Sequence, residues 1–231
     1  MCRVSQVAGK IFTKSKHGIT EVRSKKMISA DVPDIIIGRL PVYLRALNLL
    51  LEEGREIIAS QELADKLGIS SAQIRKDLSH FGEFGKQGTG YEIKYLREQL
   101  RKILKVDREL DVALVGAGDL GHAIAHHGNF DRNGFHIVAV FDHNPQKIGA
   151  NMGRFQILGS ESMPTVIQEM GIQLAIIAVP ADSAQQVADI LIKAGVRAIL
   201  SYAPITLNVP SKVRVQYIDP VVHLQRMTYY L

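Results

Sequence analysis

Three glycines, at positions 116, 118 and 121, have the spacing with the clearest chemical meaning in this sequence. They follow an apolar run at residues 112–115 and open a helical pattern. In such a segment the first glycine permits a tight turn, the second lets the backbone approach a pyrophosphate, and the third allows close helix–strand packing. The N–H groups at the helix start then face the phosphates. The segment predicts a dinucleotide site formed by Gly116, Ala117, Gly118, Asp119, Leu120 and Gly121.

An acidic residue in the right place supports this interpretation. Asp142 ends the next predicted strand, 21 residues after Gly121. A carboxylate there hydrogen-bonds a ribose hydroxyl and disfavours a 2′-phosphate, so NADH and NAD+ are favoured over their phosphorylated forms. Val179 and Pro180 follow a later strand, and we expect them at the same crevice. The alternative is a glycine-rich turn in an α/β protein that binds no ligand.

Asp119 has two opposing effects in this segment. A first-turn carboxylate stabilises a helix by about 0.3–1 kcal/mol, and we expect its side chain to face solvent. The same charge repels a pyrophosphate, so weakened cofactor binding stays open.

A second group of residues predicts contact with DNA. Ser70 and Gln73 form a capping box, and Ile74, Leu78 and Phe81 form an apolar stripe. Gln and Arg make bidentate contacts to base edges, whereas Lys and Ser more often contact phosphates. The residues left outside the stripe are Ser71, Gln73, Arg75, Lys76 and Ser79, and further candidates for backbone contacts are Arg39, Arg45 and Lys86. The alternative for each is a solvated surface side chain.

The elements expected around this helix form a winged helix-turn-helix. A first helix is expected from Pro41, with Gly54 as its stop. A second is expected from Ser60 as N-cap to Gly68. Aromatic and glycine residues at 84–93 predict a tight hairpin, the wing, and residues 95–104 predict a further amphipathic helix.

In the second half of the chain the pattern of apolar residues changes from mostly helices to short strands that alternate with helices. Apolar strands are expected at 112–115, 137–141, 174–179, 198–200 and 213–218, and helices at 121–126, 163–170 and 183–194. Alternating strands and helices imply parallel βαβ units. The predicted fold class is α/β, an N-terminal winged helix-turn-helix followed by a Rossmann-type parallel sheet and a C-terminal helix.

Charge is divided unevenly between these halves. Residues 1–110 hold 20 Lys/Arg and 14 Asp/Glu, whereas residues 111–231 hold 8 and 9. A basic half suggests a polyanion partner. The single cysteine, Cys2, excludes a disulfide framework or a cysteine-based zinc site within one chain, and no metal is expected. No apolar stretch predicts a membrane span or a secretory signal, so a cytoplasmic location is expected.

The ordered combination of motifs resembles the redox-sensing repressor family Rex. The segments that carry the resemblance are 39–45 (RLPVYLR), 73–82 (QIRKDLSHFG), 85–91 (GKQGTGY), 115–118 (VGAG) and 179–181 (VPA). The resemblance implies a homodimer on palindromic operator DNA, released by NADH, with NAD+ competing without the same release. It also implies that the C-terminal helix is swapped into the partner subunit. The expected organisation is a disordered basic tail at 1–33, a winged helix at 34–104, an NAD(H) domain at 105–218 and a dimerisation helix at 219–231.

Two residues depart from the family pattern. Asp119 stands where the family commonly has a basic or amide residue. His127 stands where a tyrosine often joins an inter-subunit sensing contact with the residue that matches Asp219. A histidine could still bond to Asp219, and the contact would then depend on pH. These departures keep open a repressor that responds to another adenine nucleotide.

An NAD-dependent dehydrogenase is the alternative from another class. It would need a catalytic acid or base and a substrate domain after the cofactor domain. Few residues remain for one, and no histidine spacing singles out a base. We therefore expect no enzymatic activity.

Overall fold

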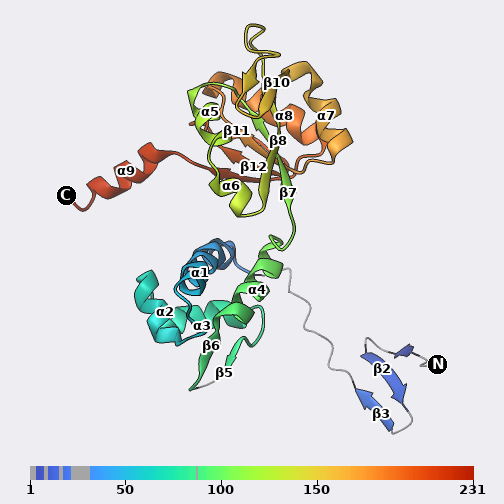
Figure 1. Ribbon diagram of the computed structural model, residues 1–231, viewed down its shortest axis with the longest axis vertical. Coiled ribbons are helices and arrows are strands. Elements are labelled where there is room, and N and C mark those ends of the chain that lie inside the picture. Colours follow the sequence, from blue (N-terminus) through green and yellow to red (C-terminus); the bar gives the residue numbers. More distant parts are fainter. Residues whose placement is uncertain (1–3, 8–9, 16–17, 22–31, 87) are drawn as a thin grey trace. The chain divides into compact units, whose positions relative to one another are not determined.

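The structure, a computed structural model, describes residues 4–7, 10–15, 18–21, 32–86 and 88–231 (Figure 1). The chain divides into two compact units, Met1–Asp107 and Arg108–Leu231. The two units are described separately below.

The helices of the first unit surround one apolar core. They are α1 (Asp34–Glu52), α2 (Ser60–Leu67), α3 (Ser71–Ser79) and α4 (Ile93–Leu104). Each contributes fully buried side chains, such as Leu47 of α1, Leu63 of α2, Ile74 of α3 and Leu96 of α4. This shared core fixes α3 against α1 and leaves the polar side of α3 at the surface.

The predicted start of the first helix at Pro41 is wrong. Helix α1 begins seven residues earlier, at Asp34, and Pro41 lies inside it. The apolar stripe continues backwards through Leu40 and Ile36, which are both buried. Proline removes one helical hydrogen bond, to the carbonyl four residues before it. Here that residue is Ile37, which is exposed, so the carbonyl that loses its helical partner lies on the solvent side of the helix.

The second helix begins at Ser60, but Ser60 is not its N-cap. Ala59 occupies the cap position and makes no side-chain hydrogen bond. The strand β4 (Ile57–Ile58) keeps the backbone extended up to Ala59, so the helix begins directly after it. Gly68 ends the helix with φ of 66°, which confirms the predicted left-handed C-terminal glycine.

The predicted hairpin is confirmed as β5 (Gly85–Lys86) and β6 (Gly90–Glu92), which pair antiparallel. The sequence did not predict β4, which pairs with the other edge of β6. Gly90 is required at this junction, because its φ is +88° and a Cβ atom would lie 2.5 Å from the Ile58 carbonyl oxygen. The wing is therefore attached to the segment that leads into α2.

Parts of residues 1–33, for which the sequence predicts a disordered basic tail, are described by the structure. Their described segments are strands β1 (Val4–Val7), β2 (Lys10–Ser15) and β3 (Gly18–Glu21), paired antiparallel in that order. The predicted disorder rested on the polar and basic composition of this segment. The β-branched and aromatic residues of β2 and β3 favour extended pairing instead.

The second unit is a doubly wound parallel sheet. Its strand order is β13-β12-β11-β7-β8-β10-β9, and β9 alone runs antiparallel. If β9 is left out and the other six strands are numbered 1 to 6 in chain order, their order from β10 to β13 is 3-2-1-4-5-6, which is typical of dinucleotide-binding folds. The strands are β7 (Leu110–Val115), β8 (Phe135–Asp142), β9 (Asn151–Met152), β10 (Phe155–Gly159), β11 (Leu174–Ile177), β12 (Ala198–Ser201) and β13 (Arg214–Tyr217). The sequence did not predict β9 or β10.

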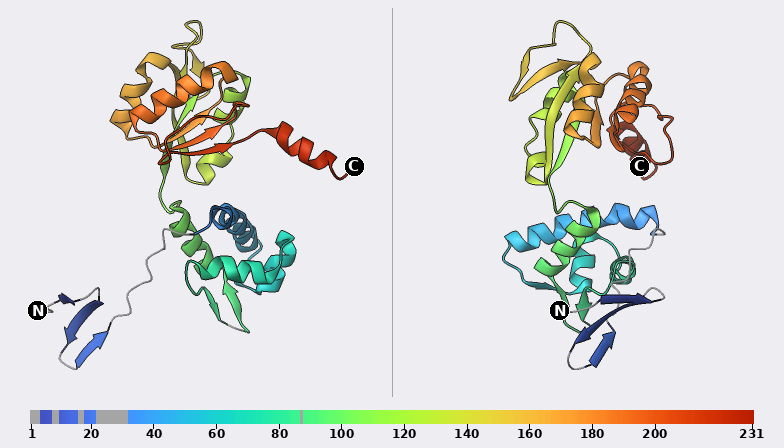
Figure 2. Two further views of the ribbon diagram at one scale, coloured as in Figure 1. Left: turned by 180° about the vertical axis from the view of Figure 1, so that it is seen from behind. Right: turned by 90° about the vertical axis from the view of Figure 1, so that its right-hand side faces the viewer.

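Helices cover both faces of this sheet (Figure 2). One face packs Ala113 and Val115 of β7 against α7 (Met163–Met170) and α8 (Ala181–Ala194). The other packs Val112 and Leu114 of the same strand against Ile124 of α5 (Asp119–Ala125). The short α6 (Asn129–Arg132) and the 3₁₀ turn Ser160–Ser162 complete the connections. Alternate residues of one strand thus enter two separate cores, which explains its continuous apolar run.

The last helix along the chain is α9 (Pro220–Thr228; Figure 1). None of its residues is buried within the described chain. The helix carries large exposed apolar side chains, including Leu224 and Met227. None of the helices in the described residues combines the length and apolar character that crossing a bilayer demands.

Candidate DNA-binding surface and dinucleotide site

Helix α3 begins with half of the predicted capping box. The Ser70 hydroxyl accepts a hydrogen bond from the Gln73 backbone N–H at 3.1 Å. The reciprocal bond from the Gln73 side chain is replaced by one to Asp77, to which Gln73 Nε2 donates at 2.6 Å. Because a carboxylate only accepts hydrogen bonds, this contact fixes which end of the Gln73 amide faces Asp77.

Asp77 is a fully buried carboxylate that ties α3 to α1. It accepts two hydrogen bonds from Arg39, at 2.6 and 2.7 Å, and one from the Tyr43 hydroxyl at 2.6 Å. Burial alone would raise the pKa of Asp77, but the bonds from Arg39, Tyr43 and Gln73 outweigh burial and hold that pKa below its usual value. The guanidinium of Arg39, a predicted contact of the DNA backbone, is bonded to Asp77 and stays partly exposed.

The remaining α3 candidates lie at the surface. Arg75 and Lys76 are exposed, and Arg75 donates a hydrogen bond to the Ser60 hydroxyl at 3.0 Å. The Ser79 hydroxyl donates to the Lys76 carbonyl at 2.8 Å, so it caps its own helix. Ser71 is half-buried at the helix start. The exposed positive charge of α3 is therefore carried by two adjacent residues.

Two other candidates lie away from α3. Arg45 is exposed on α1, beside a shallow apolar groove of about 450 Å³ that reaches α2. Lys86 ends β5, but its side chain lies outside what the structure describes.

The glycine segment forms the strand–turn–helix that its spacing predicts. Gly116 has φ of +107°, and a Cβ atom there would lie 2.4 Å from the Ala178 carbonyl oxygen. A Cβ atom on Gly121 would lie 1.9 Å from the Gly116 carbonyl oxygen, whereas one on Gly118 would meet no atom within 4 Å. Two of the glycines are thus required by packing, and Gly118 alone faces open space. Asp119 and Leu120 follow it at the surface, in the first turn of α5.

Asp142 holds this segment in place. Its Oδ2 atom accepts the Ala117 N–H at 2.8 Å, and its Oδ1 atom accepts the Asn144 N–H at 2.8 Å. Lys147 Nζ lies 3.5 Å from Asp142 Oδ2 and donates to the Ala117 carbonyl at 3.1 Å. Burial acts to raise the pKa of Asp142, but these N–H groups and the Lys147 charge together lower it. A carboxylate offers about four acceptor positions, so these contacts leave room for a ribose hydroxyl.

The glycine segment lies where the strand order reverses. Strand β7 pairs with β8 on one side and β11 on the other, so the loops after β7 and β11 border the switch point at which such sheets bind ligands. Val179 follows β11, and its side chain would lie 3.1 Å from a Cβ atom on Gly116. Pro180 is the N-cap of α8 and is exposed.

The two residues of the expected sensing contact have different local roles in one chain. His127 is exposed and packs edge-on against Phe130, with ring centroids 5.8 Å apart. Asp219 caps α9 by accepting the Val221 N–H at 2.9 Å. Within the described residues of one chain the two side chains form no ion pair.

Asp77 and Lys147, which contact predicted site residues, were not themselves predicted as site residues, and neither was Tyr91. Asp77 bonds to residues 34 and 38 positions away, which no local pattern reveals. Tyr91 was recognised only as an aromatic residue of the wing. Among the described residues, no group of three or more His, Cys, Asp or Glu side chains is arranged to hold a metal ion.

Comparisons with known proteins agree with both halves of this description. The family described as "Putative DNA-binding protein N-terminus" matches residues 31–79, and that described as "CoA binding domain" matches residues 107–205. The redox-sensing transcriptional repressor Rex of Roseiflexus sp. (strain RS-1) is 55% identical over 201 residues, which cover 87% of this chain and 91% of that protein. Rex of Brevibacillus brevis is 42% identical, with coverage of 87% and 97%. This chain belongs to the Rex family of redox-sensing transcriptional repressors.

Solved structures of a Rex-family repressor, RSP, share the fold. RSP in complex with β-NAD+ and operator DNA is 37% identical, with a TM-score of 0.83 and coverage of 87% of this chain and 93% of RSP. RSP in complex with β-NADH is 35% identical, with a TM-score of 0.79 and coverage of 87% and 95%. The Rex family is one of transcriptional regulators, so the alternative of a dehydrogenase is excluded.

Proposed function

We propose that this Rex protein represses transcription as a homodimer on palindromic operator DNA and that NADH, bound at the glycine segment, releases it. The observation that carries the proposal is a glycine segment at the switch point of the sheet, in the same chain as an exposed basic helix of a winged-helix unit. RSP, a relative of the same family, binds β-NAD+, β-NADH and operator DNA. The protein would act in the cytoplasm, where DNA and the dinucleotide pool meet.

Each residue of the dinucleotide site has a proposed role. The N–H groups that follow Gly118 hold the pyrophosphate, and Asp142 uses a free acceptor position for the ribose. Val179 and Pro180 form the opposite wall of the crevice. Exposed Asp119 supports α5 through its charge while weakening the attraction for the pyrophosphate.

The switch requires a difference in affinity between two states. NADH must prefer the released state by roughly 10⁴-fold to move the population from almost wholly bound to almost wholly free. A dinucleotide that binds both states equally leaves the operator occupied. NAD+ then competes with NADH without causing release.

Titration of one protein–DNA complex with three ligands tests the proposal. Fluorescence anisotropy would follow a labelled palindromic duplex, selected by this protein from a random pool, during addition of NADH, NAD+ or ATP. We expect release by NADH at concentrations where NAD+ leaves the complex intact. Equal release by NADH and NAD+ contradicts redox sensing, and release by ATP alone indicates the other effector. Calorimetry on the free protein measures the affinity for each ligand.

A further inference from the structure

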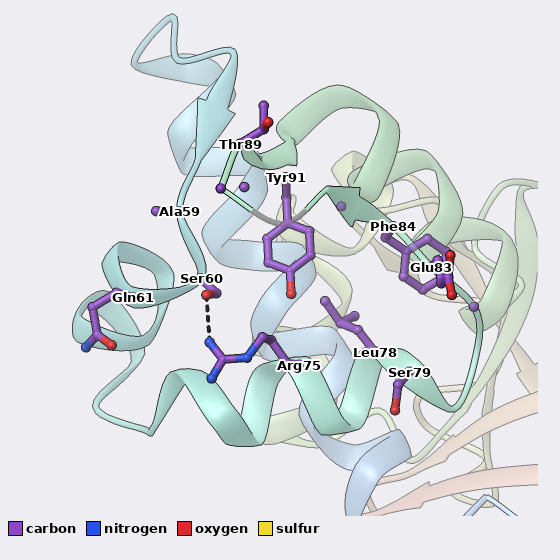
Figure 3. A pocket seen from close by; sticks show the side chains of 14 residues that line it. Ala59, Ser60, Gln61, Arg75, Leu78, Ser79, Glu83, Phe84, Thr89 and Tyr91 are labelled. Carbon is purple, nitrogen blue, oxygen red and sulfur yellow. Dashed lines mark hydrogen bonds between the residues drawn. The ribbon is translucent and has the colours of Figure 1, made fainter.

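A cavity of about 750 Å³ lies between α3 and the wing (Figure 3). Its walls come from the start of α2, one side of α3, the loop that follows α3 and the strands β5 and β6. Tyr91, Arg75 and Ser60 bring side-chain polar groups to it. These three residues take no part in the dinucleotide site, which belongs to the other unit.

Tyr91 directs an unpartnered hydroxyl into this cavity. The residue is only 7% exposed, and its ring is packed so closely under the wing that a Cβ atom on Gly85 would lie 2.7 Å from it. Its hydroxyl makes no hydrogen bond to any described residue, and it is not among the fully buried polar atoms, so a ligand in the cavity can reach it. Burial raises the pKa of Tyr91 more than the neighbouring Arg75 charge lowers it, so the hydroxyl remains a donor.

Arg75 and Ser60 face the same space from two other elements. The hydrogen bond from Arg75 Nη1 to Ser60 Oγ, at 3.0 Å, holds the guanidinium beside the start of α2. The remaining guanidinium N–H groups and the hydroxyl proton of Ser60 stay available as donors.

The start of α2 adds backbone donors. Ala59 at the cap position makes no side-chain bond, and the first N–H with an acceptor in the preceding turn is that of Leu63, bonded to the Ala59 carbonyl. Among the described residues the N–H groups of residues 60–62 have no acceptor, and residues 60 and 61 line the cavity, so their N–H groups can bind an anion there. Glu62, in the same turn, is neutralised by Arg55 at 2.8 and 3.0 Å, and Glu83 is an exposed residue of the lining.

We propose that this cavity seats one backbone phosphate of double-stranded DNA, held by the Tyr91 hydroxyl, the Arg75 guanidinium and the N–H groups that begin α2. The Arg75 charge and the donors of Tyr91, Ser60 and the start of α2 match a phosphodiester of one negative charge, whereas the carboxylate of Glu83, exposed in the same lining, opposes it. A DNA backbone is favoured over a free anion because exposed Lys76 continues the basic surface along α3. The inference rests on the proposed function and assigns Arg75 to a phosphate instead of a base edge.

A matched pair of tyrosine variants of the full-length protein tests this. Tyr91→Phe removes only the hydroxyl, and Tyr95→Phe removes an equivalent hydroxyl from an exposed residue of α4 outside the cavity. Affinity would be measured for the selected palindromic duplex and for a random-sequence duplex of the same length. Because phosphate contacts carry no sequence information, we expect Tyr91→Phe to lose roughly tenfold on both duplexes and Tyr95→Phe to lose nothing.

A second variant, which does not disturb the core, is tested by the salt dependence of its DNA affinity. Arg75→Gln changes an exposed side chain and should weaken binding to both duplexes. It should also lower the slope of log K against log salt by about one, because one phosphate contact is lost. Tyr91→Phe removes no charge and should leave this slope unchanged.

Methylphosphonate substitution identifies the phosphate directly. Each backbone position of a half-site would be neutralised in turn, symmetrically in both halves. We expect one position at which neutralising the phosphate weakens binding of the wild type but weakens binding of Tyr91→Phe only slightly further. At all other positions the loss from the neutralised phosphate and the loss from Tyr91→Phe should add.

Three results would overturn the assignment: full affinity of Tyr91→Phe, a loss confined to the selected duplex, or an equal loss in Tyr95→Phe. A wild-type protein that binds neither duplex would refute the proposed function and this inference together. Wild-type binding with an unaffected Tyr91→Phe refutes the inference alone.

Discussion

Asp77 shows how a single side chain positions the DNA-binding surface. It is fully buried, and its four hydrogen bonds come from Arg39, Tyr43 and Gln73. Removing one partner of a buried ion pair is costly, because the other charge stays without compensation. Arg39 keeps a quarter of its side chain in contact with solvent, which reduces that cost. Asp77 therefore contributes to stability and also holds the Gln73 amide at the surface of α3.

We predict that Asp77→Asn lowers the free energy of unfolding by about 2–3 kcal/mol at pH 7. The pKa of Asp77 is lowered in the folded state, so its contribution is complete above the unfolded pKa and disappears as pH falls below about 4. Denaturant unfolding at pH 7, 5 and 3 should show the difference between wild type and variant shrinking toward pH 3. Asp65→Asn, at an exposed position of α2, is the control and should change little. A difference that is constant with pH would contradict this role.

At the scale of elements, the turn from β7 into α5 separates a ligand role from a packing role. Gly118 and Gly121 are three residues apart, yet only Gly121 has no space for a side chain. We predict that Gly118→Ala keeps the unfolding free energy of the ligand-free protein and loses at least tenfold in NADH affinity. Gly121→Ala should lose about 3 kcal/mol of stability, because its Cβ forces α5 away from the turn. Thermal unfolding and calorimetry measure both effects, and the reverse pattern would refute the assignment.

The sequence predicts well those elements that a pattern of neighbouring residues marks. The strands of the sheet core are continuous apolar runs, and the glycine spacing directly after the first of these runs marks the turn into α5. Strand β10 was missed because Gln156 and Gly159 interrupt its apolar pattern, and β4 because two residues become a strand only through pairing with β6.

Local and long-range signals differ in the same way for the site residues. The surface of α3 follows from its periodicity, whereas the bond of Arg39 to Asp77, 38 residues away, has no local signal. The cavity beside Tyr91 needs three segments brought together by the fold, and no spacing in the sequence encodes that.

At the scale of the whole molecule, α9 needs a partner surface. A helix of nine residues is marginal in isolation, and this one buries no residue within the described chain. Val221, Leu224 and Met227 are each more than half exposed. Exposed apolar side chains grouped in this way mark an interaction site, and the family resemblance implies a second copy of the chain.

We therefore predict that the double variant Leu224→Gln, Met227→Gln dissociates at micromolar concentrations at which the wild type is dimeric. The double variant His223→Gln, Arg226→Gln is the matched control, because it places the same two side chains at polar positions of the same helix. Sedimentation velocity measures the mass of each. Since a palindromic operator presents two half-sites, the dissociated variant should also lose affinity for the full palindrome and keep its affinity for an isolated half-site. A variant that stays dimeric would show that α9 is not what joins the subunits, and the dimer would then have to be held by surfaces outside α9.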